Sequence, residues 1–171
     1  STVLLGYRPP YDWEGILAFL RARAIDGVEC IDSDSYRRSV HLGGHTGWIR
    51  VTHAPDKRAL CLQFSHALTP VLPALLGRVH NLFDLSARPD VIAAHLSQDA
   101  RLRTLIKQNP GLRVPGAFDG FELAVRAILG QQVTVKAATT LSCRLAATFG
   151  EPIVTPFPDL HRLTPLPERL A

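Results

Sequence analysis

Apolar and polar residues alternate along three segments in the first half of the chain, and this pattern predicts β-strands. The alternating segments are 35–42, 47–53 and 59–65. In the last of them, Leu60, Leu62 and Phe64 point to one side and the residues between them to the other. Arg38 is an exception, because it stands among the apolar positions of its segment. Short turns join the three segments, so together with an apolar strand over 3–6 they predict an antiparallel sheet.

Two other segments of the first half have the helical period, in which apolar residues recur every three or four positions. Asp12 is suited to cap the first helix, which we expect to end at Gly27. Thr69 is suited to cap the second, with Pro70 in its first turn. The apolar stripes are Trp13, Ile16, Leu17, Leu20 and Ala24 in the first helix and Leu72, Leu75, Leu76, Val79 and Phe83 in the second. A sheet with two helices over one side predicts a small α+β domain, which we assign to residues 1–88.

No segment after residue 88 has the pattern of a strand, so we expect residues 89–171 to be helical and irregular. The predicted helices are 90–96, 99–107, 119–129 and 134–149. Asp119 and Thr134 are suited to cap the last two, and Glu122 follows Asp119 at the spacing of a capping box. Only the polar corner 130–133 separates these two helices. We therefore predict a buried helical pair with this corner at its solvent end.

Composition excludes several classes of protein. With 46% hydrophobic and 20% charged residues, the chain has the composition of a globular protein, and no apolar run approaches the ~20 residues of a membrane span. The three cysteines form no C-x-x-C pair and the seven histidines have no metal-binding spacing, so we expect no metal site and reduced thiols in a cytoplasmic protein. The net charge of +4 comes mainly from arginine, which suits phosphate binding, but there is no polybasic run. The sequence contains no methionine, and we expect it to belong to a longer polypeptide.

Three stretches give the chain a resemblance to a known family. They are YRPPYDW over 7–13, LFDL over 82–85 and FELAVRAILGQQVT over 121–134. In this order and spacing they resemble the AlkA-type 3-methyladenine DNA glycosylase II family, which belongs to the helix-hairpin-helix DNA glycosylases. The resemblance covers nearly the whole chain. It implies an α+β domain like the TATA-binding protein, followed by an incomplete helix-hairpin-helix glycosylase domain.

The resemblance also implies a function in base-excision repair by a bacterial enzyme. Such an enzyme flips an alkylated nucleotide, for example 3-methyladenine, out of double-stranded DNA and hydrolyses its glycosidic bond without a cofactor or metal. This chemistry needs a wedge that fills the gap in the duplex, an aromatic pocket for the base and a carboxylate near the sugar. Methylation makes a purine electron-poor, which favours its stacking on electron-rich rings.

The family's motif places the wedge at Gln132, with Gln131 beside it. The alternative is that both glutamines only satisfy backbone groups at the helix ends. Phe19 matches an aromatic residue of the family's base pocket, and it lies roughly 110° from the centre of the buried stripe of its helix. The alternative for Phe19 is packing between two domains. Arg126 and Lys136 are candidate phosphate contacts, although a solvated side chain is the commoner role on a helix.

The family's hairpin, a loop of the Leu-Pro-Gly-x-Gly type, does not occur in this sequence. In the family the catalytic aspartate follows that hairpin, so we assign no catalytic residue to this chain and expect it to be inactive alone. We also expect the apolar faces of the last two helices to be partly uncovered, which favours self-association.

Two other functions stay open from the sequence. The chain could be the DNA-binding part of a fused alkylation-response regulator, or part of a metabolic enzyme whose α+β half holds a ligand pocket. DNA binding that weakens steeply with salt separates the first from the second.

Overall fold

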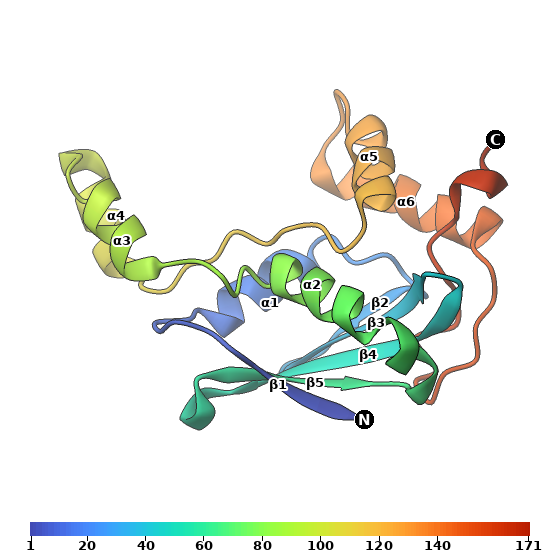
Figure 1. Cartoon of the computed structure of the whole chain (residues 1–171). Coiled ribbons are helices and arrows are strands. Elements are labelled where there is room, and N and C mark those ends of the chain that lie inside the picture. Colours follow the sequence, from blue (N-terminus) through green and yellow to red (C-terminus); the bar gives the residue numbers. More distant parts are fainter.

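The computed structural model describes all 171 residues, and its first half is built on a five-stranded antiparallel sheet (Figure 1). The strands are β1 (Thr2–Gly6), β2 (Glu29–Ile31), β3 (Ser35–Leu42), β4 (His45–Ala54) and β5 (Ala59–Phe64). Their order across the sheet is β1-β5-β4-β3-β2, so a meander of four strands is closed by β1 at one edge. The sequence pattern predicts every strand except β2, which is too short to show an alternation.

Two helices, α1 (Trp13–Arg21) and α2 (Leu72–Leu82), lie on one face of this sheet (Figure 1). Their apolar stripes and the inward side chains of the strands form one core, in which Leu17, Tyr36 and Phe83 are almost fully buried. The predicted α+β architecture is therefore confirmed.

The ends of these two helices differ from the prediction. α1 ends at Arg21, and Gly27 instead adopts a left-handed φ of 78° in a turn six residues later, where an added Cβ would lie 3.0 Å from the His161 ring. Thr69 does not cap α2. It lies in a 3-10 helix (His66–Val71) that is anchored by the fully buried Leu68, and α2 begins only at Leu72. Tertiary packing thus overrides both local signals.

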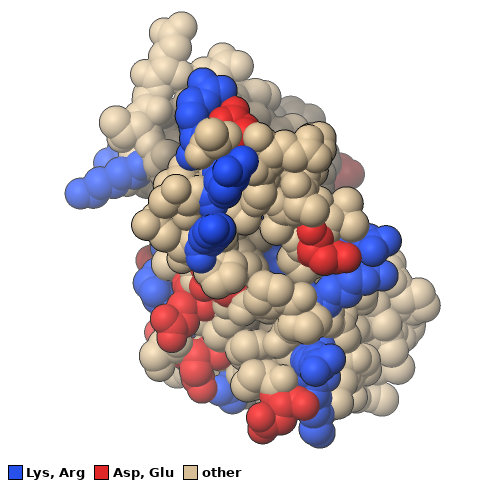
Figure 2. All heavy atoms as spheres, turned by 90° about the vertical axis from the view of Figure 1, so that its left-hand side faces the viewer, with Lys and Arg blue, Asp and Glu red and all other residues tan.

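The next two helices, α3 (Pro89–Leu96) and α4 (Ala100–Gln108), form a hairpin that projects away from the sheet (Figure 1). Figure 2 views the molecule from the side on which this hairpin projects. Basic side chains form a row on the nearest part of the surface, and acidic side chains lie among and below them. No continuous basic surface results. The chain then returns through residues 109–119, which Arg113 fixes by donating to the backbone carbonyls of Arg8, Pro10 and Asp84.

The last two helices are α5 (Gly120–Leu129) and α6 (Val135–Phe149). Their predicted caps are confirmed, because Asp119 accepts from the backbone N–H of Glu122 (3.0 Å) and Thr134 from that of Ala137 (3.2 Å). The prediction that these two helices form a buried pair is wrong for part of their surface. Large apolar side chains there are exposed, namely Leu123 (54%), Ile128 (67%), Leu141 (37%) and Phe149 (43%). This bears out the expectation that the apolar faces of both helices are partly uncovered.

Residues 150–171 form an irregular segment that returns to the β2–β3 side of the first half. It pairs through single bridges between Gly27 and Leu160 and between Pro152 and Arg162, and it ends in a 3-10 turn at Pro167–Arg169. Leu160 and Leu163 are buried, so this segment is packed against the fold. No helix of the chain combines the length and apolar character that crossing a membrane requires.

Candidate nucleic-acid interface

The corner between α5 and α6 lies on the surface. Gln131, Gln132 and Val133 are all exposed, and no hydrogen bond joins either glutamine side chain to another group of the protein. Gln132 has a left-handed backbone with φ of 58°, which costs a residue with a side chain on the order of 1 kcal/mol. The alternative hypothesis, that the glutamine side chains form hydrogen bonds with backbone groups at the helix ends, therefore has no support. The chain holds two free amide side chains at the tip of a strained turn.

Phe19 lies on α1 at the edge of the core, and 41% of it is exposed. It lines a cleft of about 390 Å³ between α1 and α5, to which Leu82, Phe118 and Leu123 also contribute. The guanidinium carbon of Arg23 lies 3.7 Å from the centroid of its ring. The ring thus lines a cleft to which both halves of the chain contribute.

A second cleft, of about 200 Å³, lies beside the corner and is lined by Gly130 and Val133. Arg23 and Arg126 line both clefts, and Arg126 Nη1 donates to the carbonyl of Arg23 (2.7 Å). Phe19 and the corner therefore lie on the same side of the molecule. The cleft that Phe19 lines and the cleft beside the corner thus share two arginines, although more than 100 residues of sequence separate Phe19 from the corner.

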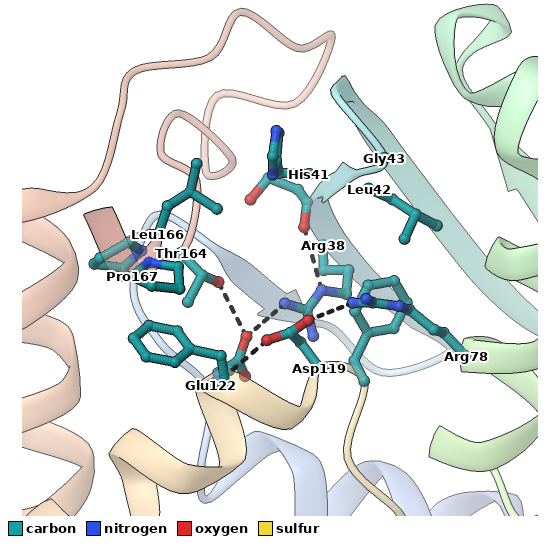
Figure 3. Close-up of a pocket in the computed structure, with 14 residues that line it drawn as sticks. Arg38, His41, Leu42, Gly43, Arg78, Asp119, Glu122, Thr164, Leu166 and Pro167 are labelled. Carbon is teal, nitrogen blue, oxygen red and sulfur yellow. Dashed lines mark hydrogen bonds and ion pairs between the residues drawn. The ribbon is translucent and has the colours of Figure 1, made fainter. Parts of the chain in front are cut away.

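A buried network of four charged residues holds this arrangement together, and part of it is visible in Figure 3. Arg38 Nη2 donates to Glu122 Oε2 (2.8 Å), and Arg126 Nη2 donates to Glu29 Oε2 (2.8 Å) and to Glu122 Oε1 (3.1 Å). Thr164 adds a hydroxyl donor to Glu122 Oε2 (3.0 Å). β2, β3, α5 and the C-terminal segment therefore meet at one cluster of charges.

The cluster strongly perturbs its own ionisation. Burial disfavours the charged form of Glu122, but the guanidinium groups of Arg38 and Arg126 outweigh burial and lower its pKa to about 2. Burial likewise opposes the charge of Arg38, whose pKa is nevertheless raised by Glu122, Tyr36 and Glu29. Glu122 is therefore ionised at neutral pH and is not available as a general acid.

The sequence contains one signal for this network, which is the charged Arg38 on the apolar side of a strand. Its partner Glu122 was expected in a capping box, and that expectation is wrong for the side chain, because its carboxylate turns to Arg38 and Arg126. Asp119 does act as a cap, and its second oxygen accepts from Arg78 Nη1 at 2.6 Å. Arg38, Arg78, Asp119 and Glu122 line a polar pocket of about 220 Å³ (Figure 3), and their charges are paired with one another.

The two candidate phosphate contacts lie in different surroundings. Lys136 is exposed in the first turn of α6 and has no ion pair. Arg126 is 24% exposed and directs its donors to Glu29, Glu122 and the Arg23 carbonyl. Lys136 is therefore free to meet a ligand, whereas Arg126 is tied to the charged network. No cluster of three or more His, Cys, Asp or Glu side chains could hold a metal ion.

Comparison with known proteins identifies the family of the chain. Residues 2–119 match the family described as AlkA N-terminal domain. The chain is 40% identical over 169 residues to DNA-3-methyladenine glycosylase 2 of Escherichia coli, covering 98% of this chain and 56% of that protein. It is 36% identical to a probable bifunctional transcriptional activator/DNA repair enzyme AlkA of Mycobacterium tuberculosis, covering 33% of that protein.

The fold also matches a solved structure, the 3-methyladenine DNA-glycosylase from Archaeoglobus fulgidus. That match has a TM-score of 0.82 and 17% identity, and it covers 99% of this chain and 57% of the other. The chain thus spans about half the length of its E. coli relative and a third of its M. tuberculosis relative. On this evidence the chain belongs to the AlkA family of DNA repair glycosylases.

Proposed function

We propose that this chain forms the DNA-reading half of a base-excision repair glycosylase that removes alkylated bases such as 3-methyladenine from double-stranded DNA. The observation that carries the proposal is an exposed, strained amide corner whose neighbouring cleft shares Arg23 and Arg126 with the cleft that Phe19 lines. A flipped nucleotide leaves a gap and needs a stacking surface, and in this proposal the corner fills the gap while Phe19 offers the surface. Residues 1–88 form the scaffold in this proposal, and residues 89–171 begin the glycosylase domain.

Each predicted site residue has a distinct part in the proposal. Gln132 enters the gap in the duplex and Gln131 contacts the base edge left unpaired. Phe19 stacks on the evicted base, and Lys136 contacts a backbone phosphate near the N-terminus of α6, where free N–H groups also favour an anion. Arg126 can contact a phosphate only if it breaks its hydrogen bonds to Glu29 and Glu122, so its contribution to phosphate binding is smaller than that of Lys136.

The proposal assigns no residue of this chain as the catalytic carboxylate. Asp119 is occupied by the N-cap and by Arg78, and Glu122 by two arginines. The proposal therefore places the carboxylate that stabilises the sugar cation elsewhere in the complete gene product, which would work in the bacterial cytoplasm without metal or cofactor.

The decisive experiment compares the complete gene product with this chain on methylated duplex DNA. We expect release of 3-methyladenine by the complete protein and none by the chain alone. We expect the chain to bind duplex DNA weakly, with an affinity that falls steeply as salt rises. An inactive complete protein, or tight binding of the chain that does not depend on salt, would contradict the proposal.

A second candidate function is the DNA-binding part of a regulator fused to the repair enzyme. It is favoured by the similarity to the M. tuberculosis protein, whose description combines a transcriptional activator with a DNA repair enzyme. The coding sequence before residue 1 separates the two candidates. Cysteines at zinc-binding spacing would support the regulator, and their absence would leave the stand-alone glycosylase.

We also propose that the isolated chain self-associates through the exposed apolar side chains of α5 and α6. Ile128 is 67% exposed and Leu123 is 54% exposed, and such a patch on a monomer favours association. Sedimentation at two concentrations should show a larger species at the higher one, and Ile128→Lys should abolish it. A monomer at both concentrations would refute this proposal.

A further inference from the structure

The face of the sheet opposite α1 and α2 has no helix over it (Figure 1). One row of residues crosses this face through all five strands at matched register. From edge to edge the row is Thr2, Gln63, Arg50, Arg37 and Cys30. The proposed DNA interface belongs to α1, α5 and α6, which lie on the other side of the sheet. This row is therefore a separate surface.

Two arginines oppose each other at the centre of the row. Arg37 on β3 and Arg50 on β4 are direct register partners, and like charges in such a pair destabilise a sheet. Arg37 is compensated, because its Nη2 donates to Asp32 (3.1 Å) and its guanidinium lies 5.1 Å from the centroid of the Phe157 ring. Arg50 makes no hydrogen bond and no ion pair with any group of the protein. The Nε atoms of both arginines are buried and have no acceptor.

The strands themselves offer no carboxylate to Arg50, and the nearby Asp32 is paired with Arg37. β1, β3, β4 and β5 contain no Asp or Glu, and Glu29, the one carboxylate on β2, is bound to Arg126 and Tyr36 in the core. The neighbour of Arg50 on its other side is Gln63, whose side chain carries a neutral amide. A half-buried cation without a partner beside a second cation is an unfavourable arrangement unless an anion joins it.

We propose that Arg50 binds a phosphate group on this open face, together with Arg37 and Gln63. Adjacent strands lie about 4.8 Å apart, so one tetrahedral oxyanion can accept hydrogen bonds from both guanidinium groups. Phosphate fits better than carboxylate because the N–H groups of Arg37, Arg50 and Gln63 outnumber the hydrogen bonds that the two oxygens of a carboxylate can accept. The Nη atoms of Arg50 carry four N–H groups that no protein group accepts, and Gln63 adds an amide. The phosphate can be free or part of a nucleic-acid strand.

The test is a titration of the ¹⁵N-labelled chain with inorganic phosphate, at constant ionic strength. We expect saturable amide shifts centred on residues 37, 50 and 63, and a rise in melting temperature with phosphate concentration. Arg50→Gln should weaken the affinity for phosphate by about tenfold or more, because the substitution removes the charge-assisted hydrogen bonds from the guanidinium group of Arg50. Arg144→Gln, an exposed arginine of α6, is the matched control and should leave the affinity unchanged. A thymidine oligonucleotide that binds the same residues more tightly than phosphate identifies nucleic acid as the source; equal or weaker binding identifies free phosphate.

Arg50→Gln also separates a ligand site from a structural role. Without phosphate, its melting temperature should equal or exceed that of the parent, because the substitution removes the repulsion from Arg37. A lower melting temperature without phosphate would show that Arg50 stabilises the fold itself and would overturn the proposal. The absence of saturable shifts, equal shifts with acetate, or undiminished binding by Arg50→Gln would also overturn it. None of these results bears on glycosylase activity.

Discussion

Glu122→Gln is the substitution that tests the buried network most sharply. Glu122 accepts from Arg38, Arg126 and Thr164 and is only 7% exposed. Glutamine keeps the size of the side chain but removes its charge, which leaves Arg38 with only the more distant Glu29, at 3.7 Å. Removing one member of a buried ion pair costs about 3–5 kcal/mol, because the other charge stays desolvated.

The lowered pKa of Glu122 gives a second route to the same magnitude. Its pKa falls from 4.5 to about 2 on folding. Such a shift is worth about 3 kcal/mol at neutral pH. Since the folded pKa is depressed, this stability is fully present above pH 4.5 and is lost as the pH falls toward 2. More than half of it, or about 2 kcal/mol, should be gone at pH 3.

Urea unfolding of the parent and of Glu122→Gln between pH 3 and 7 measures both quantities. We expect the difference in unfolding free energy to be largest at pH 7 and to shrink below pH 4.5. Glu151→Gln is the matched control, because Glu151 pairs with Arg169 at 2.7 Å on the surface and should contribute no more than about 1 kcal/mol. A cost for Glu122→Gln that equals the control, or a difference that does not change with pH, would refute the reasoning.

Three further predictions concern the corner, the cap of α6 and the hydroxyl of Tyr36. Gln132→Gly should raise the unfolding free energy by up to about 1 kcal/mol by relieving the left-handed strain, and Gln132→Val should lower it; equal values in urea unfolding would show that the turn is not strained. Thr134→Ala should cost about 1 kcal/mol through loss of the α6 cap, with amide exchange increasing first in residues 135–138. Tyr36→Phe removes a buried hydroxyl that donates to Glu29 at 2.6 Å and should cost about 1–3 kcal/mol in thermal unfolding; an unchanged stability would show that Glu29 needs only Arg126.

Local features of the fold were the ones that the sequence could predict. The caps at Asp12, Asp119 and Thr134 involve residues within three positions of each other, so their chemistry is complete in the sequence. The alternating strands are also local, because their pattern reports which face is buried. The expected ends at Gly27 and Thr69 failed where a distant group decides the backbone, as His161 does for Gly27.

The candidate site was predictable in part. The corner and Phe19 could be proposed from matching residues, but the link between their two clefts rests on Arg23 and Arg126, which join segments far apart in the chain. The Arg38–Glu122 pair spans 84 residues, and neither residue predicts the other. An arginine among apolar strand positions indicates a buried partner without identifying it.

The central claim is that the corner and Phe19 act together on one evicted nucleotide. It is tested most directly by single-turnover release of 3-methyladenine from methylated duplex DNA by the complete gene product and its variants. Phe19→Ala and Gln132→Ala should each slow release by roughly ten- to a hundredfold, the scale of a lost base–aromatic or base-gap contact. Lys107→Gln, on the projecting α3–α4 hairpin, should leave the rate unchanged. Rates for Phe19→Ala and Gln132→Ala that match Lys107→Gln would contradict the account.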